Sequence, residues 1–294
     1  MQLGLGTVQF GLDYGVANTT GQTPEHEVQR ILRVAAAGGV SVLDTAAAYG
    51  GSEAVLGRLL ESGHGFEVVT KIRPLQGKFR SGDVRTSLEG SLERLGMGHV
   101  HGLLVHHACD LLGPCGKMLF VELESLRDQG LVDLVGASIY DATEMDALLD
   151  RYDVDLVQVP LNVLDQRLLS GGQLARLAAR GVQVHVRSIF LQGLLLMDPA
   201  SLNPYFEPIR GHLAAWRKTL AEQGLTPAQG ALAFARSLDA DVVLVGVEDS
   251  AQLAANIADF AAAADLDFAP FALDDDKYVD PSKWVLTTCP SHNS

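Results

Sequence analysis

Basic residues are scarce in this 294-residue chain. It has 22 lysines and arginines against 36 aspartates and glutamates, so its formal net charge is -14. Proteins that bind the phosphate backbone of nucleic acids need a positively charged surface. The charge balance therefore argues against a nucleic-acid partner, although a small anionic ligand could still bind in a local pocket.

Cysteines are few, and long apolar runs are missing. The three cysteines, Cys109, Cys115 and Cys289, form neither a CxxC pair nor a disulfide framework. No uncharged apolar stretch is long enough to span a bilayer. The first residues, Met1 to Gly6, have no basic region or long apolar run of the kind found in a signal peptide. We therefore expect a protein of the reducing cytoplasm with no membrane partner.

Short apolar runs typical of buried strands alternate with helical stretches. The predicted strands are Leu3 to Thr7, Val40 to Asp44, Phe66 to Lys71, His101 to His106, Leu131 to Ala137, Asp155 to Val159, Val182 to Val186 and Asp241 to Val247. The predicted helices are Pro24 to Ala37, Ser52 to Glu61, Ser81 to Leu95, Gly116 to Gln129, Ala142 to Tyr152, Gly172 to Arg180, Pro227 to Ser237 and Ser250 to Phe260. Eight such repeats predict an α/β fold, a (β/α)₈ TIM barrel forming one domain over residues 1–294, with a doubly wound open sheet as the main alternative.

Four polar residues lie where three of these strands end. Asp44, Lys71 and His106 each close an apolar run, and Tyr49 lies in the turn just after Asp44. In a parallel barrel the carboxyl ends of the strands meet at one mouth, which is where such folds carry their chemistry. We therefore expect the four side chains to come together there.

This combination is suited to carbonyl chemistry. A phenol has a pKa of about 10 and needs help to protonate a carbonyl oxygen near neutral pH. We expect the Lys71 ammonium to acidify Tyr49, Asp44 to keep Lys71 charged, and His106 to orient the carbonyl. None of these groups is a nucleophile or a metal ligand, so the electrons must come from a bound cofactor.

Each of these residues also has an ordinary structural interpretation. A lone aspartate at a strand end is usually a cap, a lone lysine a solvated charge and a lone histidine a structural residue. The joint arrangement favours the functional interpretation. His107 competes with His106, but strand alternation would place it on the opposite face, which also disfavours a metal-dependent hydrolase built on the two histidines.

Two segments interrupt the strand-helix repeat. Residues 188–211 form a long connection after the seventh predicted strand, and residues 265–294 form a C-terminal tail. Loops after barrel strands build ligand sites, so we expect both segments near the mouth, although the tail could simply stabilise the barrel. Candidate substrate-pocket residues are Phe10, Tyr14, Arg73, Phe206 and Trp284.

The chain resembles the aldo-keto reductases over most of its length. The resemblance is carried by Gly4-Leu5-Gly6-Thr7, by the turn from Asp44 to Gly50 with Ser52-Glu53, by Thr70-Lys71, His106, Gly136-Ala137-Ser138 and Gln158, and by the run from Ser188 to Leu195. It implies a (β/α)₈ barrel that binds NADPH, sometimes NADH, and reduces a small carbonyl or sugar substrate; for this chain we weigh NADH almost equally with NADPH. It also implies that Asp44, Tyr49, Lys71 and His106 form the catalytic tetrad, with Tyr49 as the general acid.

The same resemblance implies cofactor contacts along the mouth. Ser138 and Gln158 match residues that hold the nicotinamide carboxamide, and Arg187 stands where many relatives stack a tyrosine on the nicotinamide. The pyrophosphate loop is matched by Ser188, Phe190, Gln192 and Gly193. The adenosine end is matched by Gly246, Asp249, Gln252 and Asn256. Many NADPH-specific relatives have a basic residue at this end, whereas Glu248 and Asp249 here would repel a 2′-phosphate.

Two functions follow from the resemblance. The first is an NAD(P)H-dependent reductase of an aldehyde, ketone or sugar carbonyl. The alternative is a cofactor-sensing regulatory subunit on the same barrel with little turnover, which the intact tetrad disfavours. The sequence does not indicate an oligomeric state, and it contains no residue cluster that we predict to bind a metal.

Overall fold

A computed structural model describes residues 1–61, 63–75, 79–262 and 266–286. Parallel strands close into a barrel in chain order, with β1 paired to both β2 and β8. They are β1 (Gln2–Gly6), β2 (Val42–Asp44), β3 (Glu67–Ile72), β4 (Val100–Val105), β5 (Val132–Ser138), β6 (Leu156–Pro160), β7 (Gln183–Arg187) and β8 (Val242–Gly246). The predicted (β/α)₈ barrel is confirmed, and the open-sheet alternative is excluded by the closure.

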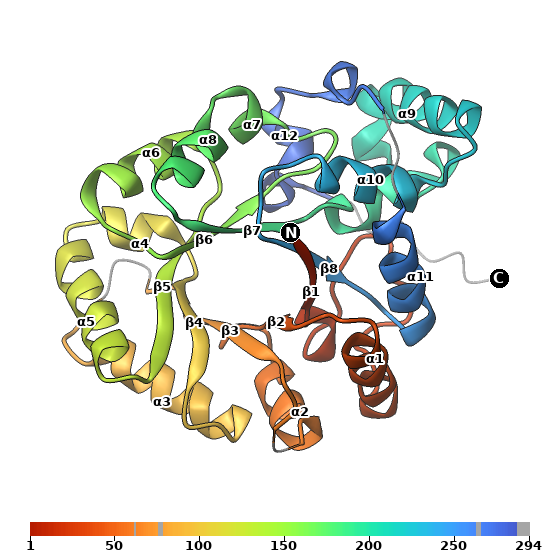
Figure 1. Cartoon of the computed structure of the whole chain (residues 1–294). Helices are drawn as coiled ribbons and strands as arrows, with labels where there is room; N and C mark the ends of the chain where they lie inside the picture. The colour runs from red at the N-terminus through yellow and green to blue at the C-terminus, as the bar shows by residue number, and fades with distance from the viewer. Residues whose placement is uncertain (62, 76–78, 263–265, 287–294) are drawn as a thin grey trace.

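Helices form a ring around the barrel (Figure 1). They are α1 (Glu25–Ala37), α2 (Ser52–Leu59), α3 (Asp83–Leu95), α4 (Ala108–Leu112), α5 (Gly116–Asp128), α6 (Ala142–Arg151), α7 (Arg167–Ser170), α8 (Gln173–Ala179), α9 (Arg210–Glu222), α10 (Pro227–Arg236), α11 (Ser250–Ala261) and α12 (Asp276–Val279). Short 3₁₀ turns are η1 (Val8–Phe10), η2 (Leu191–Leu196), η3 (Pro199–Ser201), η4 (Pro204–Ile209), η5 (Ala269–Phe271) and η6 (Pro281–Lys283). None of the helices described is long and apolar enough to cross a membrane.

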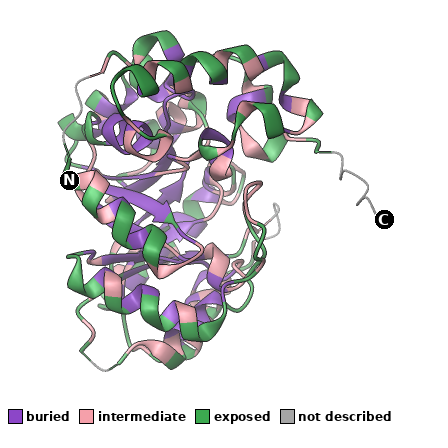
Figure 2. Cartoon of the chain, turned by 90° about the vertical axis from the view of Figure 1, so that its right-hand side faces the viewer, coloured by how far each residue is buried: buried purple, intermediate pink, exposed green. Residues whose placement is uncertain are grey.

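The helices are amphipathic and bury one face against the strands. In α1 the buried residues are Val28, Ile31, Leu32 and Ala35, whose spacing of three and four places them on one helical face. The strands are almost wholly buried, and the outer faces of the helices are exposed (Figure 2). The main core therefore lies between the barrel and its ring of helices.

A second, smaller apolar cluster fills the inside of the barrel. It consists of Val42, Val69, Leu104, Leu156, Val242 and Leu244. Side chains alternate between the two faces of a strand, so the residue two positions later also points inward, one layer nearer the carboxyl ends. That rule places Asp44 above Val42, Lys71 above Val69, and Gln158 above Leu156, so the barrel itself assembles the polar layer at its mouth.

His185 also points into the barrel, because it lies two residues before Arg187 and pairs in register with Gln158. Its side chain is fully buried, and neither ring nitrogen has a hydrogen-bond partner among the described residues. Burial lowers the pKa of His185 to about 3, while Asp241 opposes this effect and His101 and Lys71 add to it. The folded chain therefore keeps this imidazole neutral at pH values where an unfolded chain would protonate it.

We expect the buried, neutral His185 to make the folded protein less stable in acid. Below the unfolded pKa of about 6.5 the unfolded state binds a proton that the folded state excludes, so stability falls as pH drops toward 3. At pH 5 the loss attributable to His185 is about 2 kcal/mol. Urea unfolding at pH 7.5 and pH 5 should show that His185→Leu loses less stability than the wild type by about that amount. Equal losses in the two proteins would contradict the prediction.

One long helix was not predicted from the sequence. Helix α9 begins at the end of the long connection after β7, and no helix was predicted between that connection and Pro227. Its buried residues, Leu213, Trp216 and Leu220, have helical spacing, so the signal was present but was overlooked beside the aromatic and proline residues before it. The connection itself contains η2, η3 and η4.

The described part of the C-terminal tail packs on the α9 and α10 side of the barrel. Phe271 packs against Trp216 with ring centroids 5.0 Å apart, and Phe268 lies 5.4 Å from Phe234. Trp284 packs on Phe206 at 4.9 Å. Residues 265 and 287–294 of the predicted tail, including Cys289, lie outside the described residues.

Candidate active site

A cavity of about 510 Å³ opens at the carboxyl ends of the strands. Asp44, Tyr49 and His106 line it together with Ser138 and Gln158. The walls also include the predicted residues Arg187, Ser188, Phe190, Gln192, Gly193, Gly246 and Gln252. Most of the residues predicted from the sequence to contact a ligand are therefore brought to one cavity by strand ends and the loops that follow them.

Lys71 and Asp44 form a buried ion pair at the base of this cavity. Lys71 Nζ lies 2.6 and 2.8 Å from the two carboxylate oxygens of Asp44, and it also donates to Thr45 O at 3.1 Å. Gln158 Nε2 donates to Asp44 Oδ1 at 2.7 Å. Lys71 is 1% exposed, so this pair is shielded from solvent screening. Burial lowers the pKa of Lys71, and the adjacent Asp44 carboxylate opposes that shift.

Tyr49 is held in place by close backbone packing. A Cβ added to Gly11 would lie 1.9 Å from Tyr49 O, and one added to Gly50 would lie 2.3 Å from Gly11 O. Gly50 also has a φ of 55°, a conformation that side chains disfavour. Two glycines therefore let the η1 segment and the Tyr49 turn touch, which brings the phenol to 3.4 Å from Lys71 Nζ.

The expectation that Lys71 acidifies the phenol is not met in the unliganded protein. Burial raises the pKa of Tyr49 well above its ordinary value, and the Asp44 carboxylate adds to this, while Arg187 opposes it. The reason is that Asp44 accepts two short hydrogen bonds from the ammonium and cancels much of its field, whereas Tyr49 sits in a site that disfavours any charge. Tyr49 therefore stays a protonated donor.

His106 is a neutral imidazole at the cavity. Burial lowers the pKa of His106 to about 3, with further lowering by Lys71, His107 and Arg187. Its ring lies edge-on to Tyr49, with centroids 5.8 Å apart, and its buried Nδ1 has no hydrogen-bond partner within the residues that the structure describes. A neutral imidazole beside a phenol can donate one hydrogen bond to a carbonyl oxygen without adding charge.

His107 does not point away from His106 as strand alternation suggested. The two rings stack at 5.1 Å, and His107 in turn stacks on Tyr140 at 5.2 Å. Strand β4 ends at Val105, so the alternation does not continue through the two histidines. His106, and not His107, lines the cavity.

Arg187 packs its guanidinium on Tyr140, the last ring of this stack. Its guanidinium carbon lies 4.5 Å from the centre of the Tyr140 ring, and its nitrogens donate to Ile139 O at 3.2 Å and to Ser188 Oγ at 3.3 Å. Among the described residues that line the cavity, Arg187 is the only lysine or arginine. It therefore supplies the positive charge of the cavity wall.

The loop after β7 has a strained backbone. Ser188, Leu191 and Gln192 have φ angles of 63°, 48° and 53°, and they are the only non-glycine residues with positive φ in the described chain. Each such conformation costs on the order of 1–2 kcal/mol, and such strain tends to occur at functional sites. Gly193 packs closely on Ala17, so this loop and the segment after η1 together bound the cavity.

The cavity has polar groups that fit a carboxamide. Ser138 is the last residue of β5, and its register partner Gln158 lies in the middle of β6; both are buried. The amide nitrogen of Gln158 donates to Asp44, but its buried Oε1 has no hydrogen-bond partner in the described part of the chain. An unpaired buried acceptor is costly, so a ligand that brings an N–H group to this point would be favoured.

Only some of the residues predicted to contact the adenosine end of the cofactor line the cavity. Gly246 and Gln252 line the cavity. Asp249 instead caps α11, accepting a hydrogen bond from Gln252 N at 2.7 Å. Asn256 is buried on α11 and does not contribute to the cavity wall.

The cavity has features that the sequence did not predict. Tyr140 and Gln9 line it, and Tyr140 lies two residues after Ser138, so strand alternation could have identified it. Of the five predicted pocket residues, Tyr14 lines the cavity, whereas Phe10 is buried in the core and Phe206 packs on Trp284. Arg73 and Trp284 are not among the lining residues.

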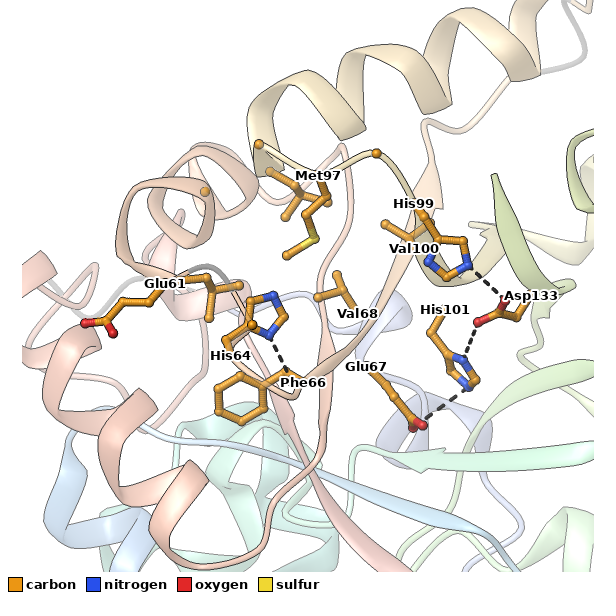
Figure 3. A pocket seen from close by; sticks show the side chains of 16 residues that line it. Glu61, His64, Phe66, Glu67, Val68, Met97, His99, Val100, His101 and Asp133 are labelled. Atoms are coloured by element: carbon orange, nitrogen blue, oxygen red, sulfur yellow. Dashed lines mark hydrogen bonds and ion pairs between the residues drawn. The ribbon is translucent and has the colours of Figure 1, made fainter. Parts of the chain in front are cut away.

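A second cavity, of about 620 Å³, lies at the opposite end of the barrel, where β3, β4 and β5 begin (Figure 3). His99 Nε2 and His101 Nδ1 lie 2.9 and 3.0 Å from the two oxygens of Asp133, and His101 Nε2 is 3.9 Å from Glu67. In the part of the chain that the structure describes, no group of three or more histidines, cysteines or acids is arranged to hold a metal ion. This cavity is at the amino-terminal ends of the strands, and in (β/α)₈ barrels that face contributes to stability.

Sequence comparisons identify relatives. The family model described as the aldo/keto reductase family matches residues 2–269. An aldo-keto reductase of a Mycobacterium species is 28% identical over 184 residues, which cover 60% of this chain and 64% of that protein, slightly under two thirds of its length. A 6-dehydroglucose reductase of Agrobacterium fabrum is 27% identical over 266 residues, covering 83% of this chain and 84% of that protein.

Solved structures agree on the fold. An aldo-keto reductase from Bacillus halodurans in its holo form superposes with a TM-score of 0.73 and 20% identity, covering 96% of this chain and 95% of that one. An aldo-keto reductase from Klebsiella pneumoniae in complex with NADPH has a TM-score of 0.70 and 21% identity, covering 98% and 94%. The match over residues 2–269 and the geometry at the barrel mouth lead to one conclusion: this chain is a member of the aldo/keto reductase family.

Proposed function

We propose that the chain is an NAD(P)H-dependent oxidoreductase that reduces an aldehyde, a ketone or a sugar carbonyl, and in reverse oxidises the alcohol. One observation carries the proposal: a protonated phenol lies 3.4 Å from a buried ammonium that is itself paired with a carboxylate, all at one cavity. Family membership supports it. The sugar carbonyl is supported by the name of the Agrobacterium relative, a 6-dehydroglucose reductase.

The chain's own residues would handle the proton. Tyr49 would donate its phenolic proton to the carbonyl oxygen, and the Lys71 ammonium would stabilise the phenolate as it forms. Asp44 would keep Lys71 in position, and neutral His106 would donate a hydrogen bond to the same carbonyl oxygen. A reduced nicotinamide, when bound, supplies the hydride.

The cavity wall would hold that nicotinamide dinucleotide. Ser138 and the free Oε1 of Gln158 are placed to bind a carboxamide. Backbone amides and Ser188 in the strained loop after β7 are suited to phosphate oxygens. The crystal structure of the Klebsiella relative contains NADPH, which supports the same class of cofactor here.

The proposal is tested by binding followed by turnover. The purified protein is titrated with NADH and with NADPH, and binding is monitored by cofactor fluorescence. At least one of the two should bind saturably. A panel of aldehydes, ketones and oxidised sugars should then oxidise the bound cofactor. Binding without oxidation by any carbonyl would overturn the reductase and favour a cofactor-sensing subunit. No binding of either dinucleotide would overturn both.

Arg187 should bias the cavity toward the reduced cofactor. A guanidinium beside a nicotinamide repels the positive charge of the oxidised ring but not the neutral reduced ring. We expect Arg187→Tyr to tighten binding of the oxidised dinucleotide relative to the reduced one by about five- to tenfold, since partial exposure weakens the repulsion to about 1 kcal/mol. Dissociation constants for both forms measure this ratio, and an unchanged ratio would show that Arg187 does not act on the ring.

A further inference from the structure

The far end of the active-site cavity stops at the start of α11. The cavity runs from Asp44, Tyr49 and His106 at one end to Gly246, Glu248 and Gln252 at the other. A helix N-terminus offers unpaired backbone N–H groups, and these attract phosphate groups. The question at this end is therefore whether those N–H groups are free to receive a ligand.

The N–H groups of Ser250 and Gln252 are already occupied by the protein itself. Ser250 N and Ser250 Oγ donate to Glu27 Oε1 at 2.8 and 2.6 Å. Gln252 N donates to the carboxylate of Asp249 at 2.7 Å, and Glu248 N donates to Gln252 Oε1 at 3.0 Å. The Glu27 carboxylate, which comes from α1, thus takes the position on the first turn of α11 that an external phosphate would need.

The charges around this helix end also oppose a dianion. Glu27, Glu248 and Asp249 gather there, and the Glu27 side chain is only 13% exposed. Arg30 is the nearby cation, but it is 64% exposed and is paired with Glu27 at 2.9 Å. Of the described residues lining the cavity, the only basic one is Arg187, at the catalytic end.

From these contacts we propose that the dinucleotide is NAD(H) in preference to NADP(H), and that Glu27 is the residue that excludes the 2′-phosphate. The inference rests on the proposed function, because it assumes that the cavity holds a nicotinamide dinucleotide. With the reacting ring beside Tyr49, the adenosine lies at the α11 end. There its free ribose hydroxyls can donate to carboxylates such as Glu248, whereas a 2′-phosphate meets three negative charges and finds the backbone N–H groups of Ser250 and Gln252 already used.

Direct titration of the unmodified protein is the first test. We expect NADH to bind about tenfold or more tightly than NADPH, a difference typical of losing a charge-assisted contact and adding repulsion. Equal binding, or tighter binding of NADPH, would overturn the inference and leave the proposed function standing. Absence of binding by both dinucleotides would overturn the proposed function and this inference together.

Two variants test the role of Glu27. Glu27→Ala frees Ser250 N and Oγ, removes one negative charge and releases Arg30, so NADPH should bind about tenfold more tightly, with NADH changed by less than about twofold. Glu27→Gln removes the charge but keeps an acceptor, so it should give a smaller gain. A loss of folding cannot produce tighter binding, and thermal unfolding followed in parallel checks the fold.

The matched control lies on the same helix. Glu25 is on the first turn of α1 but pairs with Arg58 of α2, and it makes no contact with α11 among the interactions described. Glu25→Gln should leave the affinities for both dinucleotides at their wild-type values. Unchanged NADPH affinity in Glu27→Ala, or the same gain in Glu25→Gln, would overturn the assignment of Glu27.

Discussion

Replacing Tyr49 with phenylalanine should lower turnover by roughly 1,000-fold while leaving cofactor binding nearly unchanged, because general acid catalysis contributes up to about 10⁴-fold. The substitution removes one oxygen from the cavity wall. Lys71 Nζ still has Asp44 Oδ1, Asp44 Oδ2 and Thr45 O as acceptors, so no buried charge is left unpaired. The loss should therefore appear in kcat rather than in stability or in the dissociation constant of the cofactor.

The control for this change is a tyrosine that lies outside the cavity. Tyr205 donates its hydroxyl to Lys277 O at 2.7 Å in the tail contact, and it does not line the cavity. Tyr205→Phe should leave turnover within about twofold of the wild type, since a single neutral hydrogen bond outside the cavity contributes only to stability. If Tyr49→Phe retained turnover within about tenfold, the proton would have to come from another group.

Replacing Lys71 with methionine should cost about 3–5 kcal/mol of stability as well as most activity, because it leaves a buried carboxylate without its counterion. Asp44 would keep only the hydrogen bond from Gln158 Nε2. The double variant Asp44→Asn/Lys71→Met should regain most of that stability, since it buries no unpaired charge, yet it should stay inactive. Urea unfolding and turnover assays together measure both effects.

A surface lysine provides the comparison. Lys218 is 78% exposed and lies 3.8 Å from Glu222 on the same helix, so Lys218→Met should change stability by no more than about 0.5 kcal/mol. A Lys71→Met protein as stable as the Lys218→Met protein would show that the Asp44–Lys71 pair is not the buried, unscreened interaction described above. A double variant no more stable than Lys71→Met would point to the same conclusion.

The alternation of apolar runs and helical stretches was enough to predict the barrel, because each of its strands is a short apolar run buried on both faces. Every strand was located to within two residues. Helix α9 was missed, because its helical spacing at Leu213, Trp216 and Leu220 follows directly on a stretch rich in turns. The meeting of Asp44, Lys71 and Tyr49 followed from strand ends alone, since parallel strands in a barrel place those ends together.

Other parts of the site depend on contacts between segments that are distant in the chain. The sequence around each residue does not indicate such contacts. The stack of His107 on His106 depends on where β4 ends. The raised pKa of Tyr49 depends on burial and on Asp44, and neither effect can be weighed without knowing the packing. The contact of Glu27 with Ser250 joins residues 223 positions apart, so nothing in the sequence near either one indicates it.

The backbone contact between Gly11 and the Tyr49 turn has a practical meaning for protein engineering. The phenol is positioned by main-chain atoms, with no room for even a methyl group between them. Libraries that vary Tyr14, Tyr140 or Gln192 can therefore be made without changing the backbone contact that positions the Tyr49 phenol. Gly11 and Gly50 should be held constant in any such library, because their replacement would shift the reacting group itself.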